Sequence, residues 1–204
     1  MTPTDALFLT PSWTKEDISY VRDMCNELKV PPEEFYAIPV IESWLNPAWS
    51  VPRDDGKTNN FVAVGLVQFT RIVAVEYKWI KTTEADPKGY ADWKVWSNAM
   101  HKMPVKDQLP YIKEFLTPFA KKHDISKAYR MYQIFAASST MDSAKELSDV
   151  IYPEGSAGYL GNQGLDIDKT DGGITLNDLK LATDDAKSRE IYKAIVIRHR
   201  ALGF

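Results

Sequence analysis

The prediction of this fold rests on the stretch Val40-Ile41-Glu42-Ser43-Trp44-Leu45-Asn46-Pro47-Ala48, which ends an otherwise apolar helix. At helical spacing, the neighbours of Glu42 on one face are Ile38 and Pro39 before it and Leu45 after it. These neighbours keep water away from the carboxyl group, and its pKa rises because water no longer stabilises the anion. A group that donates a proton to a sugar leaving group needs such a raised pKa.

Glu42 also has an ordinary explanation, because a partly exposed Glu near a helix end commonly forms a salt bridge. Pro39 adds a second feature to this helix. Proline has no N–H and disturbs the helical turn before it, so we expect a kink or a lost hydrogen bond just before Glu42. The position of Glu42 alone does not distinguish a proton donor from a Glu in a salt bridge. The residues that follow it in the sequence provide further evidence.

A second informative stretch is Asn59-Asn60-Phe61-Val62-Ala63-Val64-Gly65-Leu66-Val67-Gln68-Phe69-Thr70, and the residues before it form a polar loop. This loop predicts a short hairpin around Asp55-Gly56, since an Asp-Gly pair favours a tight turn. Taken alone, Gly65 is explained by close packing and Gln68 by a surface amide. The order of the parts is the informative feature: Glu-Ser-x-x-x-Pro-x-Ala, then a polar loop, then Gly-Leu-x-Gln-Phe.

Together these parts resemble the lysozyme-like superfamily of peptidoglycan-cleaving enzymes, and within it the soluble lytic transglycosylases and their bacteriophage relatives. The catalytic-Glu motif of that family is matched by Glu42, Ser43, Pro47 and Ala48. Its Gly-Leu-Met-Gln stretch is matched by residues 65–68, with Val67 in place of Met. The resemblance covers residues 14–80 and becomes weaker beyond them.

The resemblance implies a mainly α, lysozyme-like fold with a small loop or hairpin region beside an active-site groove. It implies that Glu42 is the general acid and base in cleavage of the β-1,4 bond between N-acetylmuramic acid and N-acetylglucosamine. Ser43, Asn60 and Gln68 are the residues implied to hold the Glu or the N-acetyl and hydroxyl groups of the substrate.

A tyrosine that approaches the catalytic Glu is a further family feature, but its usual Ala-Tyr-Asn-Ala-Gly motif is absent here. The nearest candidate is the stretch Tyr129-Arg-Met-Tyr132, which looks like the Tyr-bearing helix of the bacteriophage members. We expect Tyr132 to support the site, with Tyr129 as the second choice. A buried core aromatic is the alternative for either residue.

Two mechanisms are compatible with this motif, and they differ in the number of carboxylates that they need. A hydrolase needs a second carboxylate about 5 Å or about 6.5–9.5 Å from the first, and Asp54 and Asp55 in the polar loop are candidates that also suit a turn. A lytic transglycosylase needs only one Glu, acting first as an acid and then as a base on the sugar's own 6-hydroxyl group. Because no second carboxylate stands out by its context, we predict the transglycosylase. The two-carboxylate hydrolase and an inactive glycan-binding or tail structural module are the alternatives.

The helical pattern predicts a single domain over residues 1–204, with a core at 13–150 followed by an acidic, Gly-rich loop and a C-terminal helix at 151–204. Thr14 and Asp17 predict a capping box for the first helix, on which Ile18, Val21 and Cys25 recur at helical spacing. Further helices are predicted after Gln68 and at residues 90–101, 105–122, 125–138, 141–150 and 184–201.

Aromatic residues are candidate platforms for sugar rings, although aromatics bury large areas and we expect most of them in the core. These candidates are Trp44, Trp49, Tyr77, Trp79, Trp93 and Trp96.

The stretch from Asn162 to Leu179 resembles an EF-hand or dockerin calcium loop. Its acidic residues are Asp166, Asp168, Asp171 and Asp178. The first two are one residue out of register and the closing bidentate Glu is missing, so we favour a helix-capping Asp/Gly turn. We predict no metal and no organic cofactor.

Composition limits the classes of function. The chain has 204 residues and a formal net charge of -3, with 44% hydrophobic residues, which is typical of a globular protein and not of a nucleic-acid binder. No apolar run approaches the about 20 residues that span a bilayer, so we expect no membrane insertion. Residues 142–186 are acidic and 187–204 are basic, so the closing helix is expected either to pack near the acidic loop or to be a solvated charged face.

The expected partners are peptidoglycan glycan strands and, for a bacteriophage protein, other tail or virion proteins. The N-terminus lacks the pattern of a signal peptide and Cys25 is the only cysteine, so we expect synthesis in the host cytoplasm. The protein would act on the bacterial cell wall or periplasm as an endolysin or as a virion-associated lysin. The mild acidity favours the virion component, because many lysins that act on anionic envelopes carry a basic face.

Overall fold

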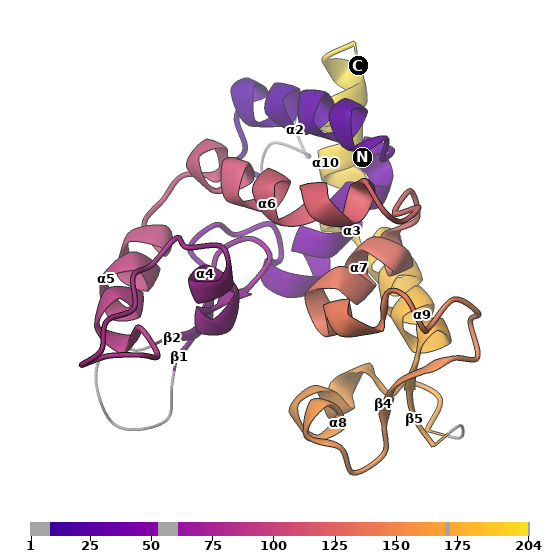
Figure 1. Ribbon diagram of the computed structural model, residues 1–204. Helices are drawn as coiled ribbons and strands as arrows, with labels where there is room; N and C mark the ends of the chain where they lie inside the picture. Colours follow the sequence, from indigo (N-terminus) through magenta and orange to yellow (C-terminus); the bar gives the residue numbers. More distant parts are fainter. Residues whose placement is uncertain (1–8, 53–60, 170–171, 204) are drawn as a thin grey trace.

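The computed structural model describes residues 9–52, 61–169 and 172–203, and these form a mainly helical protein with two small antiparallel sheets (Figure 1). The helices are α2 (Lys15–Leu28), α3 (Pro32–Ser43), α4 (Arg71–Glu76), α5 (Tyr90–Met100), α6 (Val105–Ala120), α7 (Ala128–Ala137), α8 (Ala157–Asn162), α9 (Leu176–Ser188) and α10 (Glu190–Ala201). The strands are β1 (Ser50–Pro52), β2 (Phe61–Val64), β3 (Phe69–Thr70), β4 (Val150–Pro153) and β5 (Gly173–Thr175). The predicted class, mainly α with little sheet, is confirmed.

Helix α2 forms as its sequence predicts. The Thr14 hydroxyl accepts a hydrogen bond from the Asp17 N–H at 3.2 Å, and the Asp17 carboxylate accepts one from the Thr14 N–H at 2.5 Å. This capping box satisfies N–H groups that the first helical turn leaves unpaired. The predicted apolar face is buried, with Ile18 and Val21 each 0% exposed.

Helix α3 is the central element, with α2 and α6 above it, α7 beside it, α9 to the lower right and α10 running upward behind α2 (Figure 1). The helix continues through Pro39, and Tyr36, Ile38 and Val40 are each 0% exposed. Its end is sharp because Trp44 and Leu45 both take left-handed backbone angles, with φ of 54° and 59°.

The β1–β2–β3 sheet follows α3 and, together with α4 and α5, forms a lobe at the left of Figure 1. Val51 pairs with Ala63, and Ala63 with Thr70, both antiparallel. The predicted hairpin therefore has paired strands, whereas its turn at Asp55-Gly56 lies outside the described residues. The helix predicted after Gln68 is wrong at its start, because residues 69 and 70 pair with β2 and α4 begins only at Arg71.

Two other helix predictions are wrong. Residues 141–150 form turns that lead into β4, because the Asp149 carboxylate accepts backbone hydrogen bonds from Lys145 (2.7 Å) and Glu146 (2.9 Å) and competes with a helix for those donors. The final helix begins at Leu176 and not at residue 184, and it is broken into α9 and α10 by the extended backbone of Arg189.

Side chains from α9 and α10 belong to the same buried cluster as those of α2, α3, α6 and α7, for example Leu179 and Ile195, which are each 0% exposed. None of the helices in the described ranges is both long and apolar enough to cross a membrane.

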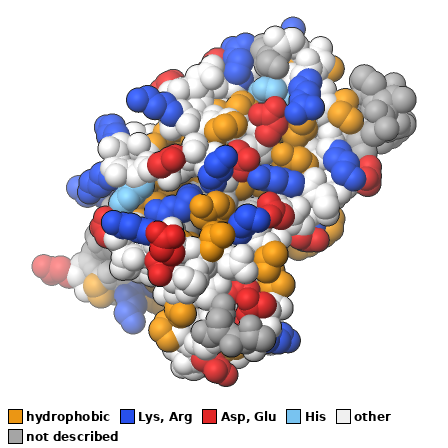
Figure 2. Space-filling view, turned by 90° about the vertical axis from the view of Figure 1, so that its right-hand side faces the viewer, with side chains coloured by type: hydrophobic (Ala, Val, Ile, Leu, Met, Phe, Trp, Pro, Cys, Tyr) orange, Lys and Arg blue, Asp and Glu red, His pale blue; other side chains and the backbone are white. Residues whose placement is uncertain are grey.

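The basic end of the chain pairs mainly with the start of α3 and with its own helices. Lys187 forms an ion pair with Glu34 at 2.7 Å, and Arg200 one with Glu33 at 3.5 Å. Arg189 pairs with Asp185 four residues before it at 2.7 Å. Figure 2 shows the consequence on one face of the molecule, where basic and acidic side chains are interleaved.

Candidate active site

Glu42 lies in the last turn of α3, where the helix is surrounded by buried apolar side chains. The residue keeps a little exposed surface, but its carboxyl group is strongly desolvated. Burial raises the pKa of Glu42 from 4.5 to about 7, and a hydrogen bond with Tyr132 opposes part of that rise. A carboxyl with this pKa is protonated in a large share of molecules near neutral pH, so it can donate a proton to a bound group.

Tyr132 reaches Glu42 from α7. Its side chain is only 4% exposed, and its hydroxyl group donates the hydrogen bond to the Glu42 carboxylate. Burial, followed by the neighbouring carboxylate, raises the pKa of Tyr132 well above its ordinary value, so the hydroxyl stays a donor. Tyr129, the second choice, instead lies near Lys180 of α9.

Ser43 was expected to hold either the Glu or groups of the substrate. It is 0% exposed, and its Oγ lies 3.0 Å from the Pro39 carbonyl oxygen and 2.9 Å from that of Leu66. Its burial and its two backbone contacts favour the first role, that of holding the helix that carries Glu42. The Ser43 hydroxyl links the end of the helix that carries Glu42 to Leu66 in the Gly-Leu-x-Gln turn. The left-handed residues after Ser43 end the helix at this turn.

The Gly-Leu-x-Gln turn depends on its glycine. Gly65 has a φ of 84°, in the region that favours glycine, and its N–H donates to the Trp49 carbonyl at 3.0 Å. A Cβ atom at Gly65 would lie 2.7 Å from Oε1 of Gln108, closer than side chains tolerate. The close-packing explanation of Gly65 is therefore correct, and the packing partner is a buried amide.

Gln68 is half-buried, and its amide is tied to the backbone. Its Nε2 donates to the carbonyl oxygens of Gly65 at 2.7 Å and Trp49 at 3.2 Å, which fixes the orientation of the amide. Its Oε1 is buried and accepts no hydrogen bond within the described part of the chain. A buried acceptor without a donor costs about 1–3 kcal/mol, and this oxygen has almost no surface that a ligand could contact.

Gln108 of α6 is a site residue that the sequence analysis missed. It is 1% exposed, and its Oε1 accepts the Leu66 N–H at 2.8 Å. A signal was present, because Gln108 falls between Val105 and Ile112 on the apolar face of its helix, where an amide must find buried partners.

The remaining predicted site residues fall outside the described residues. These are Asn60, a predicted substrate ligand, and Asp54 and Asp55, the candidates for a second carboxylate. The choice between one and two carboxylates stays a prediction.

The aromatic candidates separate into two groups. Tyr77, Trp79, Trp93 and Trp96 pack together, with the ring centroids of Trp79 and Trp96 5.7 Å apart. Trp44 and Trp49 are 51% and 43% exposed. The Arg189 guanidinium lies over the Trp44 ring at 4.6 Å, so this face of the ring is already covered.

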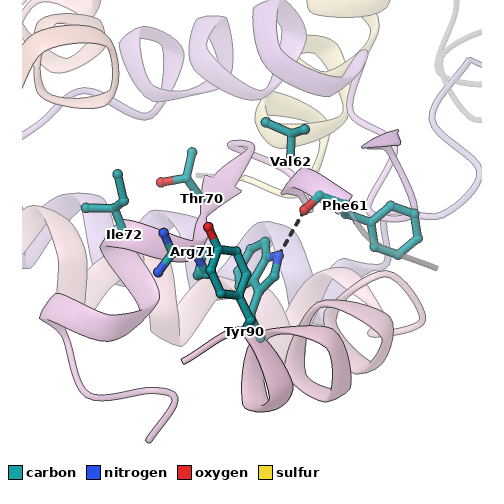
Figure 3. Close-up of a pocket in the computed structure, with 7 residues that line it drawn as sticks. Phe61, Val62, Thr70, Arg71, Ile72 and Tyr90 are labelled. Atoms are coloured by element: carbon teal, nitrogen blue, oxygen red, sulfur yellow. Dashed lines mark hydrogen bonds between the residues drawn. The ribbon is translucent and has the colours of Figure 1, made fainter. Parts of the chain in front are cut away.

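A separate cavity of about 390 Å³ opens between the β2–β3 strands and α5, and Glu42 is not among its lining residues (Figure 3). Arg71 and Tyr90 point toward one another there, with the guanidinium 4.3 Å from the ring centroid, and Trp93 donates to the Phe61 carbonyl at 2.9 Å. The cavity and the Gly-Leu-x-Gln turn are close in sequence, because Thr70 lines the cavity and follows Gln68 by two residues.

The acidic residues of the suspected calcium loop gather as a group in which carboxylate oxygens of Asp166, Asp168 and Asp178 lie within 4.8 Å of one another. The oxygens of Asp178 already accept hydrogen bonds from the Thr175 N–H at 2.9 Å and the Ile167 N–H at 2.8 Å. The favoured helix-capping role is confirmed for Asp178, while Asp171 lies outside the described residues.

Comparisons of this chain with models of protein families, with curated proteins and with solved structures found no match.

Proposed function

We propose that this protein has a lysozyme-like fold and cleaves the β-1,4 bond between N-acetylmuramic acid and N-acetylglucosamine in peptidoglycan, as a lytic transglycosylase. The observation that carries this proposal is the Glu42 carboxyl, with a pKa of about 7, held by the Tyr132 hydroxyl at the end of a buried helix. The motif resemblance supports the substrate class, and the desolvated Glu42 carboxyl supports a proton-donor role at the Glu of that motif.

In the proposed reaction, protonated Glu42 transfers its proton to the glycosidic oxygen as the bond to C1 of the muramic acid breaks. Positive charge develops on that sugar, and the carboxylate now accepts the hydrogen bond from Tyr132. The carboxylate then takes the proton of the sugar's own C6 hydroxyl, whose oxygen attacks C1. The product is a 1,6-anhydro ring, and no water is consumed.

Gln68 has a supporting role in this proposal. Its amide is fixed on the carbonyl oxygens of Gly65 and Trp49, so it holds the turn after the Glu42 motif in place, and contact with the N-acetyl or hydroxyl groups of a sugar rests on the motif resemblance.

The alternatives stand on different observations. A two-carboxylate hydrolase requires Asp54 or Asp55 to lie at a suitable distance from Glu42. An inactive glycan-binding module has no need for a desolvated carboxyl, so the raised pKa of Glu42 favours an enzyme. The bacteriophage origin, as an endolysin or a virion-associated lysin, rests on the resemblance alone.

The test measures soluble sugar released from purified peptidoglycan by the wild type, by Glu42→Gln and by Glu146→Gln. Glu146 is an exposed Glu far along the chain from either motif, so its variant controls for the loss of one negative charge. We expect release by the wild type and by Glu146→Gln but a loss of at least about 1,000-fold in Glu42→Gln, on the scale of losing an essential proton donor. Equal release by Glu42→Gln, or no release by the wild type from several wall types, would overturn the proposal.

A further inference from the structure

A buried amide of α6 joins the two motifs that define the candidate site. Gln108 is 1% exposed among apolar neighbours of its helix. An amide in such a position is costly unless its donors and acceptor are paired, so its partners are expected to be specific.

The partners of Gln108 come from both motifs. Its Oε1 accepts the N–H of Leu66, from the Gly-Leu-x-Gln turn, at 2.8 Å. Its Nε2 donates to the carbonyl oxygen of Pro47, from the Glu-Ser-x-x-x-Pro motif, at 2.7 Å. A third contact, from Nε2 to the Met103 carbonyl at 3.0 Å, anchors the amide to the segment before α6.

From these contacts, short chains of hydrogen bonds lead to the two functional side chains. Leu66 offers its carbonyl oxygen to the Ser43 hydroxyl at 2.9 Å, and Ser43 directly follows Glu42. On the other side, the Trp49 carbonyl, two residues after Pro47, accepts from Nε2 of Gln68 at 3.2 Å.

We propose that Gln108 is a positioning residue of the candidate site, which fixes the Gly65–Gln68 turn against the loop after Glu42 and thereby holds Glu42 and Gln68 in one geometry. It acts through Leu66 and Pro47. The inference concerns the arrangement of the site, and only its kinetic consequence rests on the proposed function.

Gln108→Met is the main variant, because methionine fills a similar volume and makes neither hydrogen bond. The freed turn is expected to loosen against Ser43 and admit water to the Glu42 carboxyl. Gln133→Met is the matched control, since Gln133 is 0% exposed and its amide joins Arg130 at 2.6 Å and Thr140 at 2.9 Å, away from both motifs.

The first measurement is the titration of the Glu42 side-chain carboxyl carbon by NMR, assigned from its absence in Glu42→Gln. We expect the apparent pKa to fall by about one unit or more in Gln108→Met, because a better hydrated carboxyl ionises more easily. Gln133→Met should lose thermal stability but keep the wild-type titration. Equal titration shifts in both variants, or none in Gln108→Met, would overturn the proposal.

The second measurement is kinetic. With peptidoglycan, we expect kcat of Gln108→Met to fall about 10–100-fold with a smaller change in KM, because misplaced reacting groups slow the chemical step. If the wild type releases no sugar, the proposed function fails while the titration still decides the role of Gln108.

Should Gln108→Met fail to fold, Gln108→Glu replaces it. The carboxyl of Gln108→Glu still accepts the Leu66 N–H, but it can donate to the Pro47 carbonyl only when it is protonated. We therefore expect the wild-type environment of Glu42 to return as the pH is lowered. If that environment does not return at acid pH, the result counts against the proposal.

Discussion

The Glu42 carboxyl experiences two opposing effects at the residue scale. Burial raises its pKa, the Tyr132 hydrogen bond lowers it, and burial is the larger effect because the pKa still reaches about 7. Burial therefore keeps a large share of the carboxyl groups protonated near neutral pH, and the Tyr132 hydroxyl donates a hydrogen bond that favours the anion.

Removing the Tyr132 hydroxyl should shift this balance. A hydrogen bond to a charged group contributes about 1.5–3 kcal/mol, so Tyr132→Phe is expected to raise the Glu42 pKa by about one unit. The alkaline limb of the pH–activity profile should then move to higher pH, and kcat should fall about tenfold because the anion loses its donor. Tyr129→Phe is the control, and an unchanged alkaline limb in Tyr132→Phe would contradict the contact.

Glu42 should also lower the stability of the folded protein above neutral pH. Its folded pKa of about 7 exceeds the ordinary value of 4.5, so the folded state holds a proton that the unfolded state releases between these values. The contribution to stability is present below pH 4.5 and is lost as pH rises through 7. Glu42→Gln is therefore expected to be more stable than the wild type by about 2–3 kcal/mol at pH 8. Denaturant unfolding at pH 4 and pH 8 measures this, and an equal difference at both would contradict the burial of the charge.

The family resemblance predicted that Tyr132 lies near Glu42, but it did not predict the direction of the Ser43 side chain. The direction depends on the left-handed backbone angles of Trp44 and Leu45 after the helix. Neither residue type favours such angles, so the sequence does not predict them. Gln108 was missed because its partners are backbone groups far away in sequence. Every residue has these groups, so the pattern of side chains does not identify them.

At the scale of elements, two capping boxes of the same kind had different outcomes in prediction. Thr14 and Asp17 start α2 as expected, whereas Thr175 and Asp178 start α9 at a place that the sequence analysis treated as a loop. The helix-capping role of this acidic stretch was expected, but the helix after it was predicted only from residue 184, because the Thr175–Asp178 pair was not recognised as a capping box.

Asp178 should accordingly be more important to stability than its counterpart in α2. Asp178→Ala leaves the Thr175 and Ile167 N–H groups without an acceptor, so we expect a loss of about 2–4 kcal/mol, against about 1–2 for Asp17→Ala. Urea unfolding compares the two variants. Equal losses would contradict the additional loop contact, and a rise in Tm with calcium that Asp178→Ala abolishes would assign this carboxylate to a metal.

At the scale of the whole molecule, the C-terminal helix closes the core against the helix that carries Glu42. Nδ1 of His199 in α10 lies 3.1 Å from the Tyr36 hydroxyl of α3, and both residues are buried. The general composition of the core and its helical class were predictable from apolar spacing. The attachment of α10 to α3 was not, because the ion pair between Arg200 of α10 and Glu33 of α3 joins residues 167 positions apart.

His199 should make this closure sensitive to acid. Burial lowers the pKa of His199, with opposing and reinforcing effects from Glu33 and from Arg22 and Arg200. Its stabilising contribution is therefore present above the ordinary value of 6.5 and is lost as pH falls through the lower folded value. In a Glu42→Gln background, which removes the opposite effect of Glu42, Tm should fall between pH 7 and pH 5 more steeply with His199 than with His199→Gln. Parallel curves would contradict a buried neutral imidazole.

The central claim is that one carboxyl cleaves the glycan without consuming water. The most direct measurement is the mass of the muramic acid end of products formed from peptidoglycan in ¹⁸O-labelled water. The expected product carries no ¹⁸O and is lighter by one water than a reducing sugar. Incorporation of ¹⁸O at C1 of the muramic acid would contradict the claim, because it would show hydrolysis and require a second carboxylate.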